Sequence, residues 1–168
     1  MTAIAPATRR KPRLLIVEDE PDLRVLIQFA ARRAEVFSTI CSAENGAVAL
    51  DLVRAGVRGE RADMPPDIVF TDYNMPRVNG LELAAELRSL PETRGVIVAL
   101  FTSADTPADR AASRQAGCCA HFSKPAGLNQ LTAILKSLPV YSLPAGDDSV
   151  RGCPGEASAA TSDMPARR

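Results

Sequence analysis

The segment Leu14-Leu-Ile-Val-Glu-Asp-Glu-Pro21 places four apolar residues directly before three acidic residues and a proline. Four apolar residues in a row, without polar alternation, are typical of a strand that is buried on both faces of a parallel sheet. Pro21 suits the first turn of a helix, because the N–H that proline lacks would have no intrahelical partner there. The segment therefore predicts a buried strand, an acidic turn and a helix in immediate succession.

This succession recurs along the chain and predicts an α/β fold. Short apolar runs alternate with amphipathic stretches five times, which is the pattern of a five-stranded parallel sheet with helices on both faces. We expect strands over residues 14–17, 36–43, 67–71, 96–101 and 120–123. We expect helices over residues 21–35, 46–55, 81–90, 106–117 and 127–138, with Gly56 ending the second helix and Thr106 capping the fourth.

Length and composition predict one domain with loose ends. The chain has 168 residues, of which 46% are hydrophobic and 24% charged, enough to build one hydrophobic core. Residues 1–12 contain two prolines and no helical or strand periodicity, so we expect a flexible lead-in. Residues 140–168 have few bulky apolar side chains, so we expect a disordered tail. The domain itself is expected over residues 13–139, without an attached output domain.

The charge balance and the apolar pattern argue against two classes of partner. Twenty basic and twenty acidic residues give no net charge, so neither nucleic acid nor a membrane is expected as a partner. The longest apolar stretches, such as residues 96–101, are too short to span a bilayer, and the N-terminus lacks the apolar core of a signal peptide. We expect a cytoplasmic protein. Its four cysteines should be free thiols, because their spacing fits neither a zinc site nor a disulfide framework.

Polar residues follow four of the five predicted strands. Ligands of an open parallel sheet bind at the carboxyl ends of its strands, so the side chains that come directly after each apolar run are expected to lie close together. These side chains are Glu18 and Asp19 after the first strand, Asp72 after the third, Thr102 after the fourth and Lys124 after the fifth. Each of them alone would be interpreted as a helix cap or a solvated surface residue, but their occurrence at successive strand ends favours a shared ligand.

The chemistry of these side chains fits a metal ion and a phosphoryl group. Carboxylates gathered at one sheet edge repel one another unless a cation offsets their charge. Mg²⁺ prefers oxygen ligands and is usually held by one or two carboxylates together with phosphate oxygens, so Asp19 and Asp72 are candidate ligands of Mg²⁺, or of Mn²⁺ in its place. Lys124 supplies a compact positive charge and Thr102 a hydroxyl donor, and Asp72 can act as the nucleophile of phosphoryl transfer.

These segments resemble the signature segments of response-regulator receiver domains. The resemblance rests on residues 14–21, on Phe70-Thr-Asp-Tyr-Asn-Met-Pro-Arg-Val-Asn-Gly80, on residues 100–104 and on His121-Phe-Ser-Lys-Pro125. It covers roughly residues 12–138, and the intervals of 30 residues from Asp72 to Thr102 and of 52 residues from Asp72 to Lys124 suit the family. It implies a flavodoxin-like (βα)5 receiver fold and a stand-alone, single-domain response regulator of bacterial two-component signalling.

The resemblance also implies a set of metal ligands around the phosphoacceptor. Asp72 would accept the phosphoryl group and would bind Mg²⁺ or Mn²⁺. Asp19 would bind the ion directly and Glu18 through a water molecule. Asn74 would offer its backbone carbonyl to the same ion.

The resemblance also implies which residues bind the phosphoryl group and which change position when it is added. Thr102 and Lys124 would contact this group, and Thr102 would move on activation. Gly80 would shape the loop after the third strand, and Pro125 would follow a cis peptide bond. The switch position, commonly Tyr or Phe in the family, is occupied by His121, the only histidine of the chain. We expect there either a pH-sensitive or otherwise altered switch, or a partly exposed histidine without such a role.

The predicted function is a phosphorylation-controlled switch. A histidine kinase or histidine phosphotransfer protein would donate the phosphoryl group, and the signal would leave through a downstream protein bound to the face of the fourth helix, fifth strand and last helix. The protein would not be an enzyme beyond its own phosphoryl acceptance and slow autodephosphorylation. Two alternatives stay open: a phosphorylation-independent interaction module, and an Mg²⁺-dependent phosphatase with an aspartyl-phosphate intermediate, for which Asn74 stands where a second acid is wanted.

Overall fold

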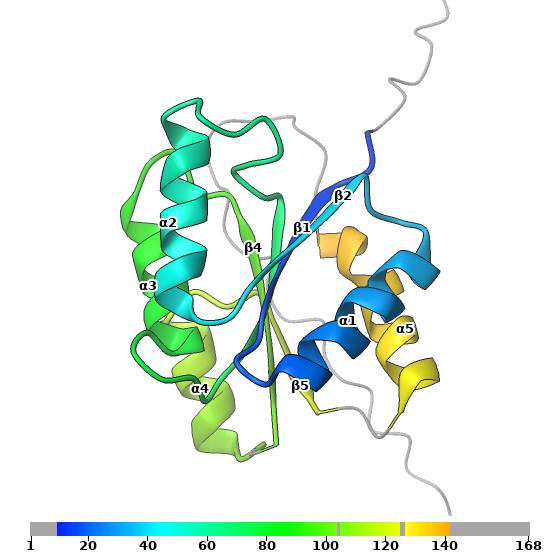
Figure 1. Cartoon of the computed structure of the whole chain (residues 1–168). Helices are drawn as coiled ribbons and strands as arrows, with labels where there is room; N and C mark the ends of the chain where they lie inside the picture. Colours follow the sequence, from blue (N-terminus) through cyan, green and yellow to red (C-terminus); the bar gives the residue numbers. More distant parts are fainter. Residues whose placement is uncertain (1–9, 104, 125–126, 142–168) are drawn as a thin grey trace, which may run out of the picture.

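The computed structural model describes residues 10–103, 105–124 and 127–141, which alternate between strands and helices (Figure 1). The strands are β1 (Arg13–Val17), β2 (Thr39–Ala43), β3 (Ile68–Asp72), β4 (Ile97–Thr102) and β5 (Ala120–Ser123). The helices are α1 (Pro21–Ala34), α2 (Gly46–Val57), α3 (Gly80–Ser89), α4 (Pro107–Gln115) and α5 (Leu128–Ser137), followed by the short 3-10 helix η1 (Leu138–Tyr141).

The described strands form one parallel sheet in the order β2-β1-β3-β4-β5. Because side chains alternate across a strand, Leu14 and Ile16 belong to one apolar cluster and Leu15 and Val17 to another on the opposite face. Helices α1 and α5 cover the first face, and α2 and α3 cover the second, as Figure 1 shows. The predicted five-stranded parallel sheet with helices on both faces is confirmed.

The prediction that Gly56 ends the second helix is wrong. Helix α2 continues through Gly56 to Val57, and Gly56 is buried. A Cβ atom at this position would lie 2.3 Å from the Cβ of Met64. The glycine therefore allows the loop before β3 to pack closely on the helix. Close packing between two separate segments cannot be read from the local sequence around the glycine.

Two element starts show what local sequence can and cannot predict. The fourth helix begins as expected, because the Thr106 hydroxyl accepts the N–H of Asp109 at 3.1 Å and the Asp109 carboxylate accepts the N–H of Thr106 at 3.1 Å. Strand β2 begins at Thr39, later than the predicted start at residue 36. The N–H of Ser38 donates to the Pro12 carbonyl at 2.9 Å, so this connecting segment is held beside the sheet without being part of it.

The cysteines are only partly as expected. Cys41 and Cys118 are free thiols, whereas Cys119 is disulfide-bonded. Cys118 is buried in the cluster under α2 and α3, and its neighbour Cys119 is half-buried against the cluster on the opposite face. The expectation of four free thiols is wrong for Cys119. The spacing of cysteines along the chain does not show which of them come close together in the fold.

The chain is fixed to the sheet directly before β1. One guanidinium nitrogen of Arg10 lies 2.8 Å from the carboxylate of Asp67, and the N–H of Arg13 donates to the same carboxylate at 2.8 Å. The expected lead-in before residue 10 and the expected tail after residue 141 lie outside the described residues and stay predictions. None of the described helices combines the length and the apolar character needed to cross a membrane.

Arg88 on α3 connects three backbone segments through its guanidinium. It donates to the carbonyl of Gly117 at 2.7 and 3.1 Å, to that of Arg94 at 2.9 Å and to that of Val96 at 2.6 Å. Burial lowers the pKa of Arg88 from its ordinary value. The acceptors belong to the turns before β4 and β5, so one side chain ties α3 to the starts of two strands.

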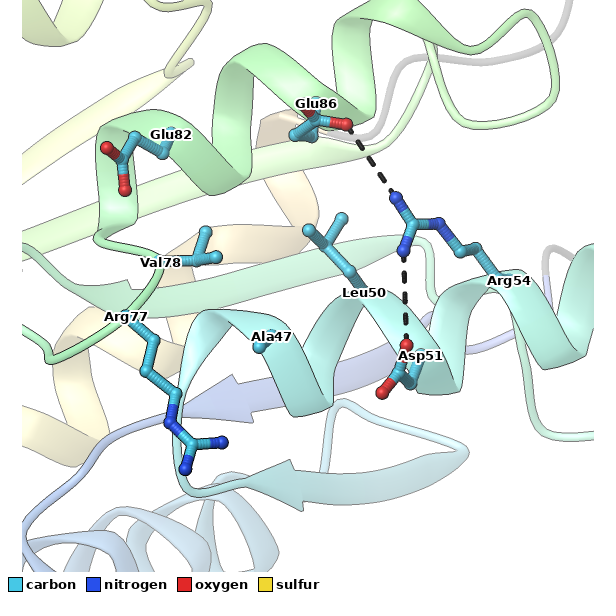
Figure 2. A pocket seen from close by; sticks show the side chains of 8 residues that line it. All are labelled: Ala47, Leu50, Asp51, Arg54, Arg77, Val78, Glu82 and Glu86. Carbon is cyan, nitrogen blue, oxygen red and sulfur yellow. Dashed lines mark ion pairs between the residues drawn. The ribbon is translucent and has the colours of Figure 1, made fainter.

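We expect Arg88→Met to lower the free energy of unfolding by about 2–4 kcal/mol, because several carbonyls would lose a charged donor. Urea denaturation would measure the change. The matched control is Arg54→Met, because among the described residues Arg54 has only two long ion pairs. One is with Asp51 on the same helix at 3.9 Å, and the other is with Glu86 at 3.8 Å across the exposed groove between α2 and α3 (Figure 2). This control should cost less than about 0.5 kcal/mol. Equal losses in both variants would show that water replaces Arg88.

Candidate functional site

The strand order places the candidate site at the carboxyl ends of β1 and β3. These two strands are neighbours, with β2 on the far side of β1 and β4 on the far side of β3. The chain therefore leaves their ends in opposite directions and opens a crevice between them, which is where open α/β sheets bind ligands. Glu18 and Asp19 directly follow β1, and Asp72 is the last residue of β3.

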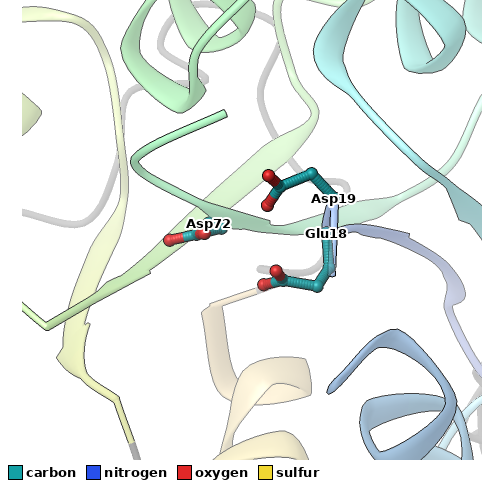
Figure 3. A group of neighbouring side chains, drawn as sticks. All are labelled: Glu18, Asp19 and Asp72. Atoms are coloured by element: carbon teal, nitrogen blue, oxygen red, sulfur yellow. The ribbon is translucent and has the colours of Figure 1, made fainter. Parts of the chain in front are cut away.

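Three carboxylates meet in this crevice. One carboxylate oxygen from each of Glu18, Asp19 and Asp72 lies within 4.8 Å of the other two. Figure 3 shows Glu18 and Asp19 projecting from the end of β1 toward Asp72. Glu18 and Asp72 are buried, with 1% and 4% of their surface exposed, whereas Asp19 is exposed to solvent. The predicted acidic cluster is present, with one member open to a ligand.

Asp72 lies between a backbone donor and a positive charge. One of its carboxylate oxygens accepts the N–H of Tyr73 at 2.7 Å, and the other lies 3.4 Å from the ammonium of Lys124. Burial raises the pKa of Asp72, while the charge of Lys124 and its hydrogen bond act in the opposite direction. Lys124 thus favours the ionised carboxylate that a nucleophile requires.

Glu18 gives the clearest sign that the cluster suits a cation. Its Oε1 accepts the N–H of Glu20 at 3.1 Å, but its buried Oε2 has no hydrogen-bond partner in the described part of the chain. Burial raises the pKa of Glu18 to about 7, and the charge of Asp72 adds to the rise. A buried carboxylate oxygen without a partner is costly, so this donor set fits a hard divalent cation that prefers oxygen.

Two further contacts hold the backbone around the cluster. A guanidinium nitrogen of Arg24 on α1 donates to the carbonyl of Glu18 at 2.8 Å. Gly80 begins α3, and a Cβ atom there would lie 2.4 Å from the carbonyl oxygen of Asp72. Gly80 is therefore needed for close packing at the end of β3, and its expected role in shaping the loop stays a prediction. Asn74 is exposed two residues after Asp72, and the use of its carbonyl by a metal stays a prediction.

Thr102 and Lys124 lie at adjacent strand ends beside the acidic cluster. Thr102 is buried at the end of β4, and its carbonyl accepts the N–H of Lys124 at 2.8 Å. His121 on β5 has a side chain that is only 8% exposed, and its Nε2 lies 3.4 Å from the carboxylate of Asp105. The expected Pro125 lies outside the described residues. Sequence reasoning missed Asp105, whose only signal was its place directly before the capping residue of α4.

Comparison with known proteins agrees with this geometry. Residues 14–136 match the family model of the response regulator receiver domain. The chain belongs to the response regulator receiver family. This match confirms the two expectations from the sequence: the receiver fold and membership of the response regulator family.

Three known proteins illustrate how the receiver compares with others. It is 30% identical over 139 residues to the alkaline phosphatase synthesis transcriptional regulatory protein SphR of Synechococcus elongatus, an alignment of 82% of this chain and 52% of SphR. The phosphorylated cyanobacterial phytochrome response regulator RcpA is 25% identical, with a TM-score of 0.68 over 83% of this chain and 98% of RcpA. The bacteriophytochrome response regulator AtBRR is 26% identical, with a TM-score of 0.64 over 83% of this chain and 100% of AtBRR. The chain spans about half the length of the curated relatives it matches.

The raised pKa of Glu18 predicts a pH-dependent stability of the metal-free receiver. A carboxyl group that binds its proton more tightly in the folded state stabilises the fold at low pH, and this contribution is lost as the pH rises through the folded pKa. We expect Glu18 to remove roughly 1–3 kcal/mol from the free energy of unfolding between the ordinary pKa of 4.5 and about 7. Urea denaturation at several pH values, with a chelator present, would measure it.

Glu18→Gln is the control for this pH profile. Burial lowers the pKa of His121, so His121 contributes a slope of opposite sign in the same pH range. This contribution is present in both proteins, so the difference between them reports Glu18 together with its coupling to Asp72. Identical pH profiles for the two proteins would show that Glu18 keeps its ordinary pKa in the fold.

Proposed function

We propose that this receiver accepts a phosphoryl group on Asp72, with the help of Mg²⁺ or Mn²⁺, from a histidine kinase or a histidine phosphotransfer protein. The observation that carries the proposal is the burial of Asp72 between two further carboxylates and the ammonium of Lys124. RcpA, a phosphorylated response regulator that is 25% identical, supports it. Receiver domains as a family accept a phosphoryl group rather than act on separate substrates, so we do not expect an enzyme beyond the receiver's own phosphorylation and slow autodephosphorylation.

The ion would be held by the oxygen donors of the acidic cluster. Asp19 and Asp72 would bind it directly, Glu18 through water, and Asn74 through its backbone carbonyl. The exposed position of Asp19 suits exchange of the ion with solvent, and the unpartnered Oε2 of Glu18 suits a bound water. When bound, the ion supplies positive charge that neutralises the phosphoryl oxygens.

The chain's own residues position the reacting carboxylate. An oxygen of Asp72 would form the new P–O bond while the P–N bond to the donor histidine breaks, and the electron pair of that bond stays on the departing imidazole. The N–H of Tyr73 holds one oxygen of Asp72 at 2.7 Å and so limits rotation of the carboxylate. Lys124 lies 3.4 Å from the other oxygen and can follow the charge as it moves to the phosphoryl group.

The signal would leave through protein contacts. Thr102 ends β4 next to the site, and its hydroxyl would bind the phosphoryl group after a shift of the β4 end. We propose that a downstream protein recognises the resulting change on the face of α4, β5 and α5, and that this exchange takes place in the cytoplasm. A histidine donor and a protein target are both consistent with a receiver module.

Asp19→Asn should weaken Mg²⁺ binding by at least about tenfold, because the variant loses a charged ligand at the open side of the cluster. Isothermal titration calorimetry with Mg²⁺ would measure the change. Asp22→Asn is the matched control, because Asp22 is an exposed acid of the same charge in the first turn of α1. Its affinity should stay within about twofold. Equal weakening in both variants would contradict a specific role of Asp19.

Incubation of the full chain with acetyl phosphate and Mg²⁺ should add one phosphoryl group that is stable to acid and labile to base. Intact-protein mass spectrometry would detect it. Asp72→Asn should carry none, because the nucleophile is gone, whereas Asp51→Asn, at an exposed position of α2, should be labelled like the wild type. Failure of every histidine kinase and small phosphodonor tested would favour the phosphorylation-independent interaction module instead.

A further inference from the structure

Helix α4 has the weakest apolar attachment to the sheet. Of its nine residues, all of them among those that the structure describes, Ser113 alone is buried. Helix α5, by contrast, buries Leu131, Thr132 and Leu135. Tertiary packing of an apolar face supplies most of the stability of a helix in a protein, so α4 must depend on other contacts.

The carboxylate of Asp105 supplies such contacts. Asp105 lies in the turn between β4 and α4, and its Oδ2 accepts the guanidinium of Arg110 on α4 and the hydroxyl of Ser123 on β5, each at 2.6 Å. Its Oδ1 lies 3.4 Å from Nε2 of His121, also on β5. One carboxylate therefore joins the turn, the start of α4 and β5.

The side chain of His121 is largely buried, yet its ring nitrogens lack hydrogen bonds. Neither Nδ1 nor Nε2 has a hydrogen-bond partner within the described residues, which is unusual for a side chain that is 8% exposed. Burial lowers the pKa of His121, an effect that Asp105 in the turn and Asp109 on α4 oppose and Arg110 on α4 reinforces. The neutral ring thus contacts a carboxylate, and protonation would turn this contact into an ion pair.

The same contacts are coupled to the phosphorylation site through the sheet. Ser123 is the register partner of Thr102 across β4 and β5, and the N–H of Lys124 donates to the Thr102 carbonyl at 2.8 Å. Asp105 follows Thr102 by three residues. A shift of the β4 end that brings Thr102 toward Asp72 therefore also shifts the carboxylate that holds Ser123 and His121.

We propose that Asp105 is a latch that holds α4 against β5 in the unphosphorylated receiver, and that protonation of His121 tightens the latch. The proposal rests on the proposed phosphorylation of Asp72. Movement of Thr102 toward the phosphoryl group separates Asp105 from His121 and releases α4. Because coupling between two binding events is reciprocal, protonation of His121 opposes phosphorylation to the same extent that phosphorylation opposes protonation.

The single histidine of the chain makes the latch directly measurable. The full chain without a histidine tag gives the imidazole signals of a single histidine in the proton NMR spectrum, and their pH titration reports His121 alone. Mg²⁺ is kept in every sample so that the acidic cluster stays ionised. The titration is repeated for Asp105→Asn and for the remote control Asp51→Asn, each with and without beryllium fluoride as the phosphoryl analogue.

We expect the pKa of His121 to be lower in Asp105→Asn than in the wild type by at least about half a unit, and to be unchanged in Asp51→Asn. Beryllium fluoride should lower the pKa of His121 in the wild type by a similar amount and in Asp105→Asn by less than half as much. Through reciprocity, the wild type should bind the analogue about twofold more weakly at pH 5.5 than at pH 7.5, relative to Asp105→Asn at the same pH values.

Several outcomes would overturn the latch. Equal pKa values of His121 in the wild type and Asp105→Asn would show that the carboxylate does not act on the ring. Binding of beryllium fluoride with an unchanged or raised pKa of His121 would remove the coupling while leaving the proposed function intact. Absence of analogue binding in every form would refute the proposed function, and the coupling with it. If Asp105→Asn does not fold, Ser123→Ala, which removes one contact without changing charge, should weaken the pH dependence, and an unaltered dependence would refute the latch.

Discussion

The burial of Glu18 and Asp72 beside each other is the constraint on which the rest of the site depends. Like charges in a water-poor environment repel strongly, and their repulsion raises the cost of ionising either group. Lys124 offsets part of this charge from the β5 side, at 3.4 Å from Asp72. The proposed divalent ion would offset the rest from the side of Asp19, which is open to solvent. The cluster is therefore unfavourable without a ligand and receptive to one.

This arrangement follows from the order of the strands. The chain places β3 next to β1 and sends β2 and β4 to opposite sides, so it leaves the ends of β1 and β3 in opposite directions, and open α/β sheets bind their ligands at such a point. Gly80 lets α3 start against the carbonyl of Asp72, and Arg24 holds the turn that carries Glu18. The carboxylates thus sit on backbone that is fixed from both faces of the sheet.

The helices differ in how they are attached to the sheet. Helices α1, α2, α3 and α5 bury apolar side chains in the two clusters that flank the sheet, and these clusters support the strands that carry the acids. Helix α4 buries only Ser113 within its described length and relies on polar contacts around Asp105. Polar contacts can be exchanged at lower cost than a packed apolar face, so the proposed rearrangement near Thr102 would move α4 more readily than the other helices.

The sequence by itself determined the elements, their parallel arrangement and the acids at the strand ends, because buried parallel strands are continuous apolar runs and because caps such as Thr106 act within one helical turn. Only the tertiary structure decided which residues separated in the chain come into contact. It showed the unpartnered oxygen of Glu18, the contact of His121 with Asp105, and the close packing that requires Gly56 inside α2. The burial that raises the pKa of Glu18 and lowers that of His121 is a property of such distant contacts, and no local pattern encodes it.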